Sequence, residues 1–128
     1  FLNNIIFTGW VGKNEIHYIS SKSNIGLMAY AKGAPQGLPN KVFEYMASGL
    51  PILSSLQTET KELIKKNKIG LSYIPNNQEN LLSKILTLIS NKKLLKEMRY
   101  NSLKTFKEKF DSEIIYENLI KFLVENKK

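Results

Sequence analysis

Three polar side chains lie within one short segment of the chain: Gln36, Lys41 and Glu44. An amide both donates and accepts hydrogen bonds, an ammonium group offers a point of positive charge, and a carboxylate accepts hydrogen bonds from hydroxyl groups. A carboxylate repels phosphate and so would weaken the binding of an anion to this segment. It is better suited to accept hydrogen bonds from sugar hydroxyls. The segment therefore indicates a ligand that carries both an anionic group and a sugar.

The elements around this segment are those of an anion site. An apolar run at 25–30 predicts a strand, and a loop rich in Gly and Pro follows it. Pro39 is suited to the first turn of a helix, which we expect over 40–48. The free N–H groups at such a helix start favour phosphate or carboxylate. A buried strand is predicted at 51–55, and the expected inward face of the helix consists of Val42, Phe43, Met46 and Ala47.

Strands and helices alternate along the whole chain, which predicts an α/β fold: one domain over 1–128 with a Rossmann-like parallel sheet and helices on both faces. Asn76 with Glu79 resembles a helix-start box, and Asp111 is expected to cap a last helix that runs to about 126. That helix carries an apolar stripe of Ile114, Ile115, Leu119, Phe122 and Leu123. Further strands are predicted at 4–8 and 70–74, and further helices near 14–22, 60–67, 78–90 and 92–109.

Composition argues against several classes of site. The chain has no Cys, one His (His17) and one Asp (Asp111), so neither a His/Cys cluster nor a paired-aspartate motif is available for a metal. We expect no metal and no cofactor. No apolar run reaches membrane-spanning length.

The net charge of +8 raises the question of nucleic acid. The basic residues are spread from Lys13 to Lys128, only Arg99 is an arginine, and no nucleic-acid motif is present, so we expect no nucleic-acid partner. A second interpretation stays open, in which the Lys-rich helices face an anionic membrane surface. We accordingly expect a cytoplasmic protein, with peripheral attachment to the inner face of the membrane left open.

Four ordered segments resemble one known family, the retaining glycosyltransferases of the GT-B fold, family 4, also called glycosyl transferases group 1. Members carry two carboxylates with seven residues between them, followed by a small residue, Gly, Pro and a buried strand. Gln36 and Glu44 have that spacing, and Ala47-Ser-Gly-Leu-Pro-Ile-Leu-Ser-Ser55 follows them. Asn4–Val11 is similar to the family's strand and glycine turn, Ile25–Tyr30 to its next strand, and Gly70–Pro75 to a later one.

The resemblance implies a nucleotide-sugar-binding domain, the C-terminal half of a two-domain enzyme whose N-terminal acceptor domain is absent from this sequence. It implies catalytic roles for Gln36, Glu44 and Lys41. Glu44 would hold the ribose hydroxyls, Gln36 would face the donor sugar, and the diphosphate would meet the start of the motif helix. The implied donor-binding residues are Gly9, Trp10, Val11, Gly37, Leu38, Pro39, Asn40, Lys41 and Glu44.

Two departures from the family pattern mark this chain. The first acidic position is Gln36, and an amide cannot stabilise positive charge as a carboxylate does. Pro39 stands where Gly is common and has no N–H, so the amides of Asn40 and Lys41 would have to serve the phosphate. The Pro-Asn-Lys variant is one we associate with bacterial surface-polysaccharide transferases, such as those of capsule or lipopolysaccharide synthesis. The acceptor would then be a lipid-linked or free saccharide. The rival interpretation is a nucleotide- or sugar-phosphate-binding module without transfer activity.

Overall fold

A three-stranded parallel sheet forms the centre of the protein in the computed structural model, which describes residues 2–126. The strands are β1 (Gly26–Met28), β2 (Ile52–Ser54) and β3 (Gly70–Ser72), in the order β1-β2-β3. Gly26 pairs with Ile52, and Ile52 pairs with Gly70, so the first residues of the three strands are aligned with one another. The predicted α/β, Rossmann-like fold class is confirmed. The strands lie within the predicted ranges and are shorter than predicted.

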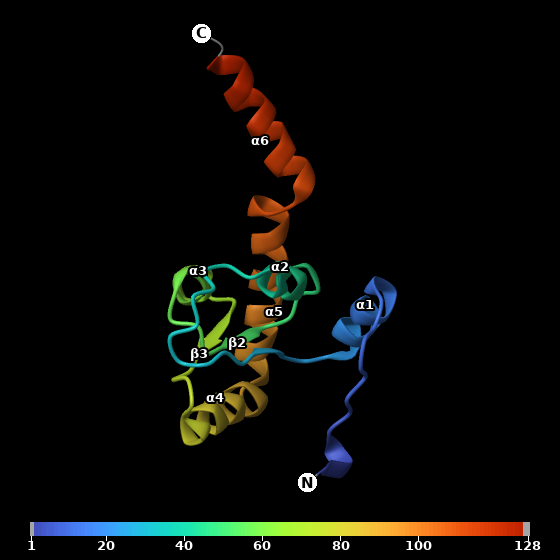
Figure 1. Cartoon of the computed structure of the whole chain (residues 1–128), viewed down its shortest axis with the longest axis vertical. Helices are drawn as coiled ribbons and strands as arrows, with labels where there is room; N and C mark the ends of the chain where they lie inside the picture. The colour runs from blue at the N-terminus through green and yellow to red at the C-terminus, as the bar shows by residue number, and fades with distance from the viewer. Residues whose placement is uncertain (1, 127–128) are drawn as a thin grey trace.

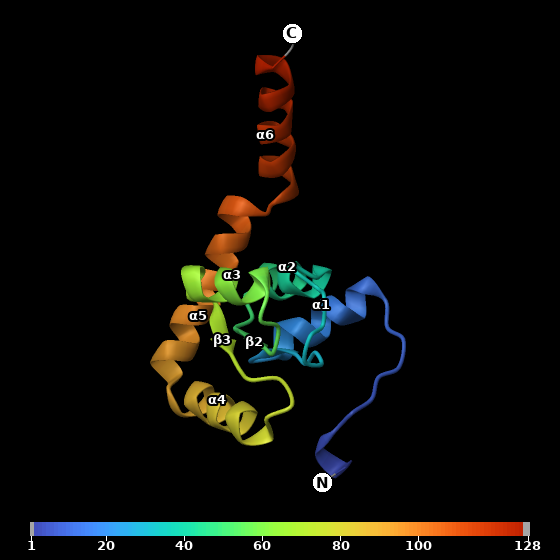
Figure 2. The same cartoon turned by 60° about the vertical axis from the view of Figure 1, so that its left-hand side comes forward.

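Helices follow the strands and flank the sheet. In Figures 1 and 2, α2 and α3 lie on one side of the strands and α4 lies on the other. The predicted helices are confirmed to within a residue at each end. They are α1 (Lys13–Lys22), α2 (Asn40–Ala47), α3 (Glu59–Asn67), α4 (Gln78–Ser90), α5 (Lys92–Lys109) and α6 (Ser112–Glu125), and a short 3-10 helix, η1, covers Leu2–Asn4.

The main core lies between one face of the sheet and the helices α2 and α3. Met28 and Ile52 supply it from the strands, Met46 from α2 and Ile64 from α3, and all four are essentially inaccessible to solvent. The helix α5 crosses behind them, and the buried hydroxyl of Ser102 donates to the carbonyls of Leu50 at 2.9 Å and Ile69 at 3.3 Å. The core thus fixes the orientation of α2, the helix that carries the motif.

The strand predicted at 4–8 is wrong. Residues 5–9 have no regular secondary structure, and no backbone hydrogen bond joins them to a strand within the described residues 2–126. The side chains of Ile6 and Phe7 are exposed. An apolar, β-branched run indicates an extended backbone, but a strand also needs a neighbour for its N–H and C=O groups. In Figure 1 this segment runs apart from the sheet.

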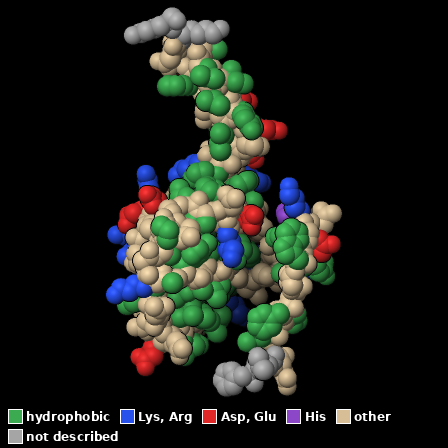
Figure 3. All heavy atoms as spheres, viewed as in Figure 1, with side chains coloured by type: hydrophobic (Ala, Val, Ile, Leu, Met, Phe, Trp, Pro, Cys, Tyr) green, Lys and Arg blue, Asp and Glu red, His purple; other side chains and the backbone are tan. Residues whose placement is uncertain are grey.

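The last helix, α6, projects away from the body of the protein (Figures 1 and 2). Asp111 caps it as predicted, because its side chain accepts a hydrogen bond from the backbone N–H of Glu113 at 3.0 Å. None of its residues is buried, and Figure 3 shows hydrophobic side chains along its length. Its large exposed apolar residues are Ile115, Tyr116, Leu119, Ile120, Phe122, Leu123 and Val124. Across residues 2–126, no helix combines the length and the apolar character needed to cross a membrane.

The start of α4 differs from the prediction by one residue. The side chain of Asn77, and not that of Asn76, accepts the hydrogen bond from the backbone N–H of Asn80 at 2.8 Å. Asn76 instead takes the left-handed conformation, with φ +60°. Asn tolerates that conformation better than most residues. Asn76 therefore forms the turn, and Asn77 caps the helix.

Asn77→Ala should lower the free energy of unfolding by about 1 kcal/mol, because the cap bond to Asn80 is lost. Asn76→Gly is the matched control, since glycine keeps the left-handed backbone and removes only the side chain. We expect that control to change stability by less than about 0.5 kcal/mol. Urea unfolding followed by circular dichroism measures both. A larger loss for Asn76→Gly than for Asn77→Ala would contradict the assigned cap.

Candidate functional site

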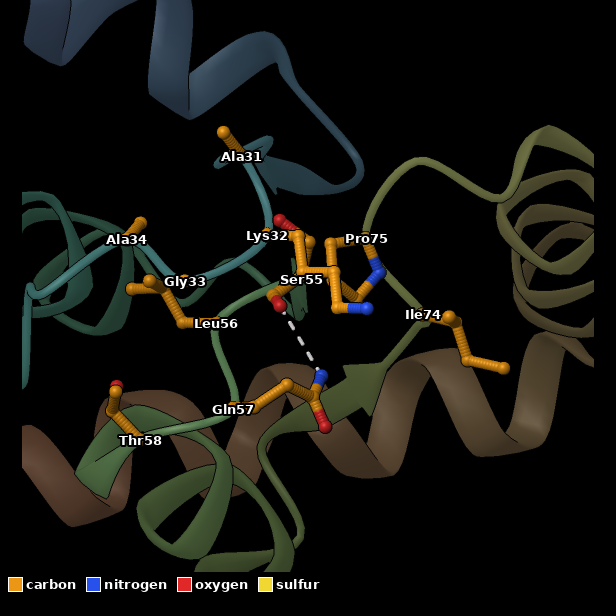
Figure 4. A pocket seen from close by; sticks show the side chains of 10 residues that line it. All are labelled: Ala31, Lys32, Gly33, Ala34, Ser55, Leu56, Gln57, Thr58, Ile74 and Pro75. Atoms are coloured by element: carbon orange, nitrogen blue, oxygen red, sulfur yellow. Dashed lines mark hydrogen bonds between the residues drawn. The ribbon is translucent and has the colours of Figure 1, made fainter.

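The loops that follow the three strands meet at one edge of the sheet, where parallel α/β folds bind ligands. They enclose a hollow of about 510 Å³, which we call the strand-end hollow (Figure 4). Residues after β1 form one wall, residues after β2 a second and residues after β3 a third. The lining consists of Ala31, Lys32, Gly33, Ala34, Ser55, Leu56, Gln57, Thr58, Ile74 and Pro75. Most of these side chains are small, which leaves room for a ligand. Among the described residues, Lys32 is the only positively charged residue in the lining.

Hydrogen bonds tie these loops together. The Ser55 hydroxyl accepts from the backbone N–H of Tyr30 at 2.7 Å and donates to the Tyr30 carbonyl at 2.8 Å. The Gln57 side-chain amide donates to the carbonyls of Ser55 at 3.2 Å and Tyr73 at 3.1 Å. These bonds link the ends of all three strands around the hollow. Figure 4 shows the bond between Gln57 and Ser55.

The loop that carries Gln36 is held from the start of α3. The Thr58 hydroxyl donates to the carbonyl of Gln36 at 2.7 Å, and the backbone N–H of Thr60 donates to that of Gly37 at 3.1 Å. The hydroxyl of Thr60 donates to the same Gly37 carbonyl. The backbone at Gln36 is thereby fixed, while its side chain is exposed and forms no hydrogen bond within the described part of the chain.

The start of α2 is open, as predicted. Pro39 precedes the helix with an extended backbone, and no side chain caps it. The backbone N–H of Val42 bonds to the Pro39 carbonyl at 3.0 Å, whereas those of Asn40 and Lys41 have no partner in residues 2–126. These two N–H groups, the partial positive charge of the helix end and the exposed ammonium of Lys41 can together hold an anion.

Glu44 lies one turn further along α2 and faces a different hollow, of about 310 Å³, between α1 and α2. We call it the α1–α2 hollow. Its lining includes Lys13 and His17 from α1 together with Glu44 from α2. Among the described residues, no ion pair or hydrogen bond joins Lys13 or His17 to Glu44, whose carboxylate is therefore free to accept hydrogen bonds from a ligand between the helices. The remaining lining residues are Ile16, Ser20, Ala47 and Ser48.

The turn Gly9–Val11 lines neither hollow. Gly9 takes φ +67°, and the side chain of Trp10 is fully exposed. Val11 is half-buried and stands two residues before Lys13 in the α1–α2 hollow. The turn therefore lies just before the start of α1, and none of its residues lines either hollow.

Tyr45, next to Glu44, has a structural role. Its hydroxyl donates to the carbonyl of Leu27 at 3.2 Å. Burial, and after it the Glu44 carboxylate and Tyr30, raises the pKa of Tyr45 above its usual value, which keeps the phenol protonated. The sequence pattern likewise indicates that this residue belongs to the core or its rim.

The structure divides the predicted site residues into four groups. Gln36, Gly37 and Leu38 lie on the loop that is tied to α3, and Pro39, Asn40 and Lys41 lie at the start of α2. Glu44 lines the α1–α2 hollow, and Gly9, Trp10 and Val11 lie in the turn before α1, outside both hollows. Sequence reasoning singled out neither Lys13 nor Lys32, and it considered His17 only as a metal ligand. It also did not predict the hydrogen bonds from Thr58 and Thr60 to the loop at Gln36 and Gly37. A cluster of Ser, Gln and Thr directly after a buried strand, at 54–60, was the available signal. Within the described residues, no group of three or more His, Asp or Glu side chains is placed to hold a metal ion.

One comparison with known proteins assigns a family. The family model described as "Glycosyl transferases group 1" matches residues 1–105, which include η1 to β3, α4 and most of α5. That match contains every residue of the two hollows described above. No curated protein and no solved structure matches the chain significantly.

Proposed function

This chain belongs to the glycosyl transferases of group 1, and we propose on that basis that it is the donor-binding domain of a retaining GT-B enzyme of family 4. The proposed ligand is a nucleotide-diphosphate sugar. Family membership supports sugar transfer in general, and the residues of this chain support the choice of donor, as follows.

The observation that carries the proposal is the arrangement along α2. The free N–H groups of Asn40 and Lys41 can hold a diphosphate, and Glu44, one turn further on, faces the α1–α2 hollow. A diphosphate at the helix start would direct its nucleoside along α2, toward Glu44 and the entrance of α1 at Gly9–Val11. Glu44 would then accept hydrogen bonds from the ribose hydroxyls, and the sugar end would extend toward Gln36 and the strand-end hollow.

In the proposed reaction, an acceptor hydroxyl oxygen forms a bond to the anomeric carbon of the donor sugar. The bond from that carbon to the diphosphate breaks, and the hydroxyl proton passes to the departing diphosphate. Negative charge grows on the diphosphate, and the helix N–H groups and the Lys41 ammonium stabilise it. Gln36 orients the sugar by hydrogen bonds, because an amide cannot supply the charge of a carboxylate.

The same proposal includes a second domain that binds the acceptor. Its support within this chain is the exposed apolar side of α6, which such a domain would cover. We propose a role in bacterial surface-polysaccharide or glycoconjugate synthesis at the inner face of the membrane, and no transfer activity for these 128 residues alone.

Calorimetric titration with uridine and guanosine diphosphate tests the proposal. We expect binding in the high micromolar to millimolar range, or about 4–6 kcal/mol, because one side of the cleft is contributed by the other domain. The matched ligands are the corresponding nucleosides, which lack the diphosphate and should bind more weakly by tenfold or so. Equal affinity for nucleoside and nucleoside diphosphate would contradict the anion site at α2.

Removal of divalent metal should leave the turnover of the full-length enzyme nearly unchanged. The reason is that helix N–H groups and Lys41 meet the charge on the leaving group in the proposed mechanism. Activity assays with EDTA, and with Mg²⁺ added back, measure the effect. A strict requirement for Mg²⁺ or Mn²⁺ would refute this part of the mechanism.

A further inference from the structure

A third hollow, of about 510 Å³, lies beside the strand-end hollow at the same edge of the sheet. We call it the tyrosine–amide hollow. Tyr30 and Ala31 contribute to it from the loop after β1, Tyr73 from the end of β3, and Asn76, Asn77 and Gln78 from the turn before α4. Ala31 lines both this hollow and the strand-end hollow, so the two are neighbours.

Most hydrogen-bonding groups of this hollow are free to meet a ligand. The hydroxyls of Tyr30 and Tyr73 and the side-chain amides of Asn76 and Gln78 form no hydrogen bond with any residue in 2–126. The side-chain oxygen of Asn77 accepts the hydrogen bond that caps α4, and its NH₂ group remains available to donate to a ligand. Tyr73 is only 6% exposed, yet no fully buried side-chain polar atom of the described residues lacks a partner. The Tyr73 hydroxyl is therefore in contact with solvent, and Tyr73 also lines a smaller hollow beside Lys61 and Lys84.

The chemistry of these groups points to a neutral, hydroxyl-rich ligand. No charged residue lines the hollow in the described part of the chain. Amides and phenols both donate and accept hydrogen bonds, which matches sugar hydroxyls, since those groups do the same. Tyrosine rings add apolar surface for the carbon faces of a sugar. A phosphate would be better served at α2 or beside Lys32, where positive charge is present.

We propose that the tyrosine–amide hollow binds one neutral saccharide unit of the acceptor, while the second domain of the proposed enzyme holds the rest of it. The inference rests on the proposed function for the acceptor role, because the hollow is next to the place proposed for the donor sugar. A saccharide held by Tyr30, Tyr73 and Gln78 would have one end at Ala31, where the strand-end hollow begins. The site would thus bring an acceptor hydroxyl toward the donor from within this domain.

Residue-resolved NMR titrations with lactose, maltose and cellobiose test the site. Each is added to about 100 mM, and we expect at least one to bind with a dissociation constant of about 1–10 mM. The side-chain NH₂ signals of Asn76, Asn77 and Gln78 should shift with it. Tyr73→Phe and Gln78→Ala should each weaken binding by about threefold to tenfold, because each removes one hydrogen-bonding group. Gln78 is exposed, so its replacement leaves the core unchanged.

The matched control is Asn118→Ala, which removes an exposed amide on α6 and should leave saccharide affinity unchanged. Shifts caused by no disaccharide, or shifts elsewhere that Gln78→Ala does not alter, would overturn the site. The same samples titrated with uridine and guanosine diphosphate separate the two proposals. Failure of both nucleotides overturns the proposed function and the acceptor role, whereas failure of the disaccharides alone overturns only the tyrosine–amide site.

Discussion

Gly70→Ala should destabilise the protein by roughly 3 kcal/mol or more, because it overpacks the contact between β2 and β3. A Cβ atom at Gly70 would overlap the backbone carbonyl of Ile52 on β2. The spacing of β2 and β3 is fixed by ladder bonds such as Tyr73 N–H to the Ser54 carbonyl at 2.9 Å. The backbone cannot yield as a side chain does, so the sheet must open. A loss of this size is a large share of the stability of a small domain.

The matched control for that substitution is Gly12→Ala. Its new Cβ would meet only the end of the Glu15 side chain, which can turn away into solvent. We expect a change below about 1 kcal/mol for this control. Urea unfolding followed by circular dichroism measures both variants. If Gly70→Ala unfolds at the same urea concentration as the wild type, the close approach of β2 and β3 is wrong.

Glu44→Ala should weaken nucleoside diphosphates and nucleotide sugars alike, by about 1.5–3 kcal/mol for a lost charge-assisted hydrogen bond. Ribose hydroxyls are present in every such ligand, which is why both lose affinity. Gln36 is proposed to contact only the sugar. Gln36→Ala should leave nucleoside diphosphate affinity within a factor of a few and lower the turnover of the full-length enzyme, and Gln36→Glu should be tolerated.

Glu117→Ala is the control for charge, since it removes an exposed carboxylate from α6, far along the chain from both hollows. Binding isotherms for the nucleoside diphosphate and the nucleotide sugar with each variant decide the assignment. Equal losses for the nucleoside diphosphate in Gln36→Ala and Glu44→Ala would mean that the two ends of the motif have been exchanged.

Much of the fold follows from local patterns in the sequence. The periodic apolar residues of α4 and α5 predicted both helices over their observed ranges, and Asp111 identified the start of α6. Strands are harder, because a strand depends on a partner distant in sequence. The segment 4–8 has strand composition and no neighbouring strand among the described residues. Asn76 and Asn77 are identical in type, so only the backbone shows which one caps α4.

The sequence predicts the segment that carries the candidate site, but not the residues from other elements that surround it. The spacing from Gln36 to Glu44 identified the segment that becomes the loop before α2 and α2 itself. That Lys13 and His17 line the same hollow as Glu44 depends on the packing of α1 against α2, which the motif does not contain. The hold of Thr58 and Thr60 on the loop at Gly37 is likewise a contact across more than 20 residues of sequence. Tertiary contacts of this kind have no local signature.

The most direct test of a donor site on α2 is a residue-resolved NMR titration of this chain with uridine and guanosine diphosphate. The proposed function predicts that at least one of them shifts the backbone N–H signals of Asn40 and Lys41 together with signals of α1 around His17. The free nucleoside should shift only the α1 signals, because it has no anion for the helix start. Nucleotide-induced shifts that leave Asn40, Lys41 and the residues around Glu44 unchanged would contradict the proposed donor site.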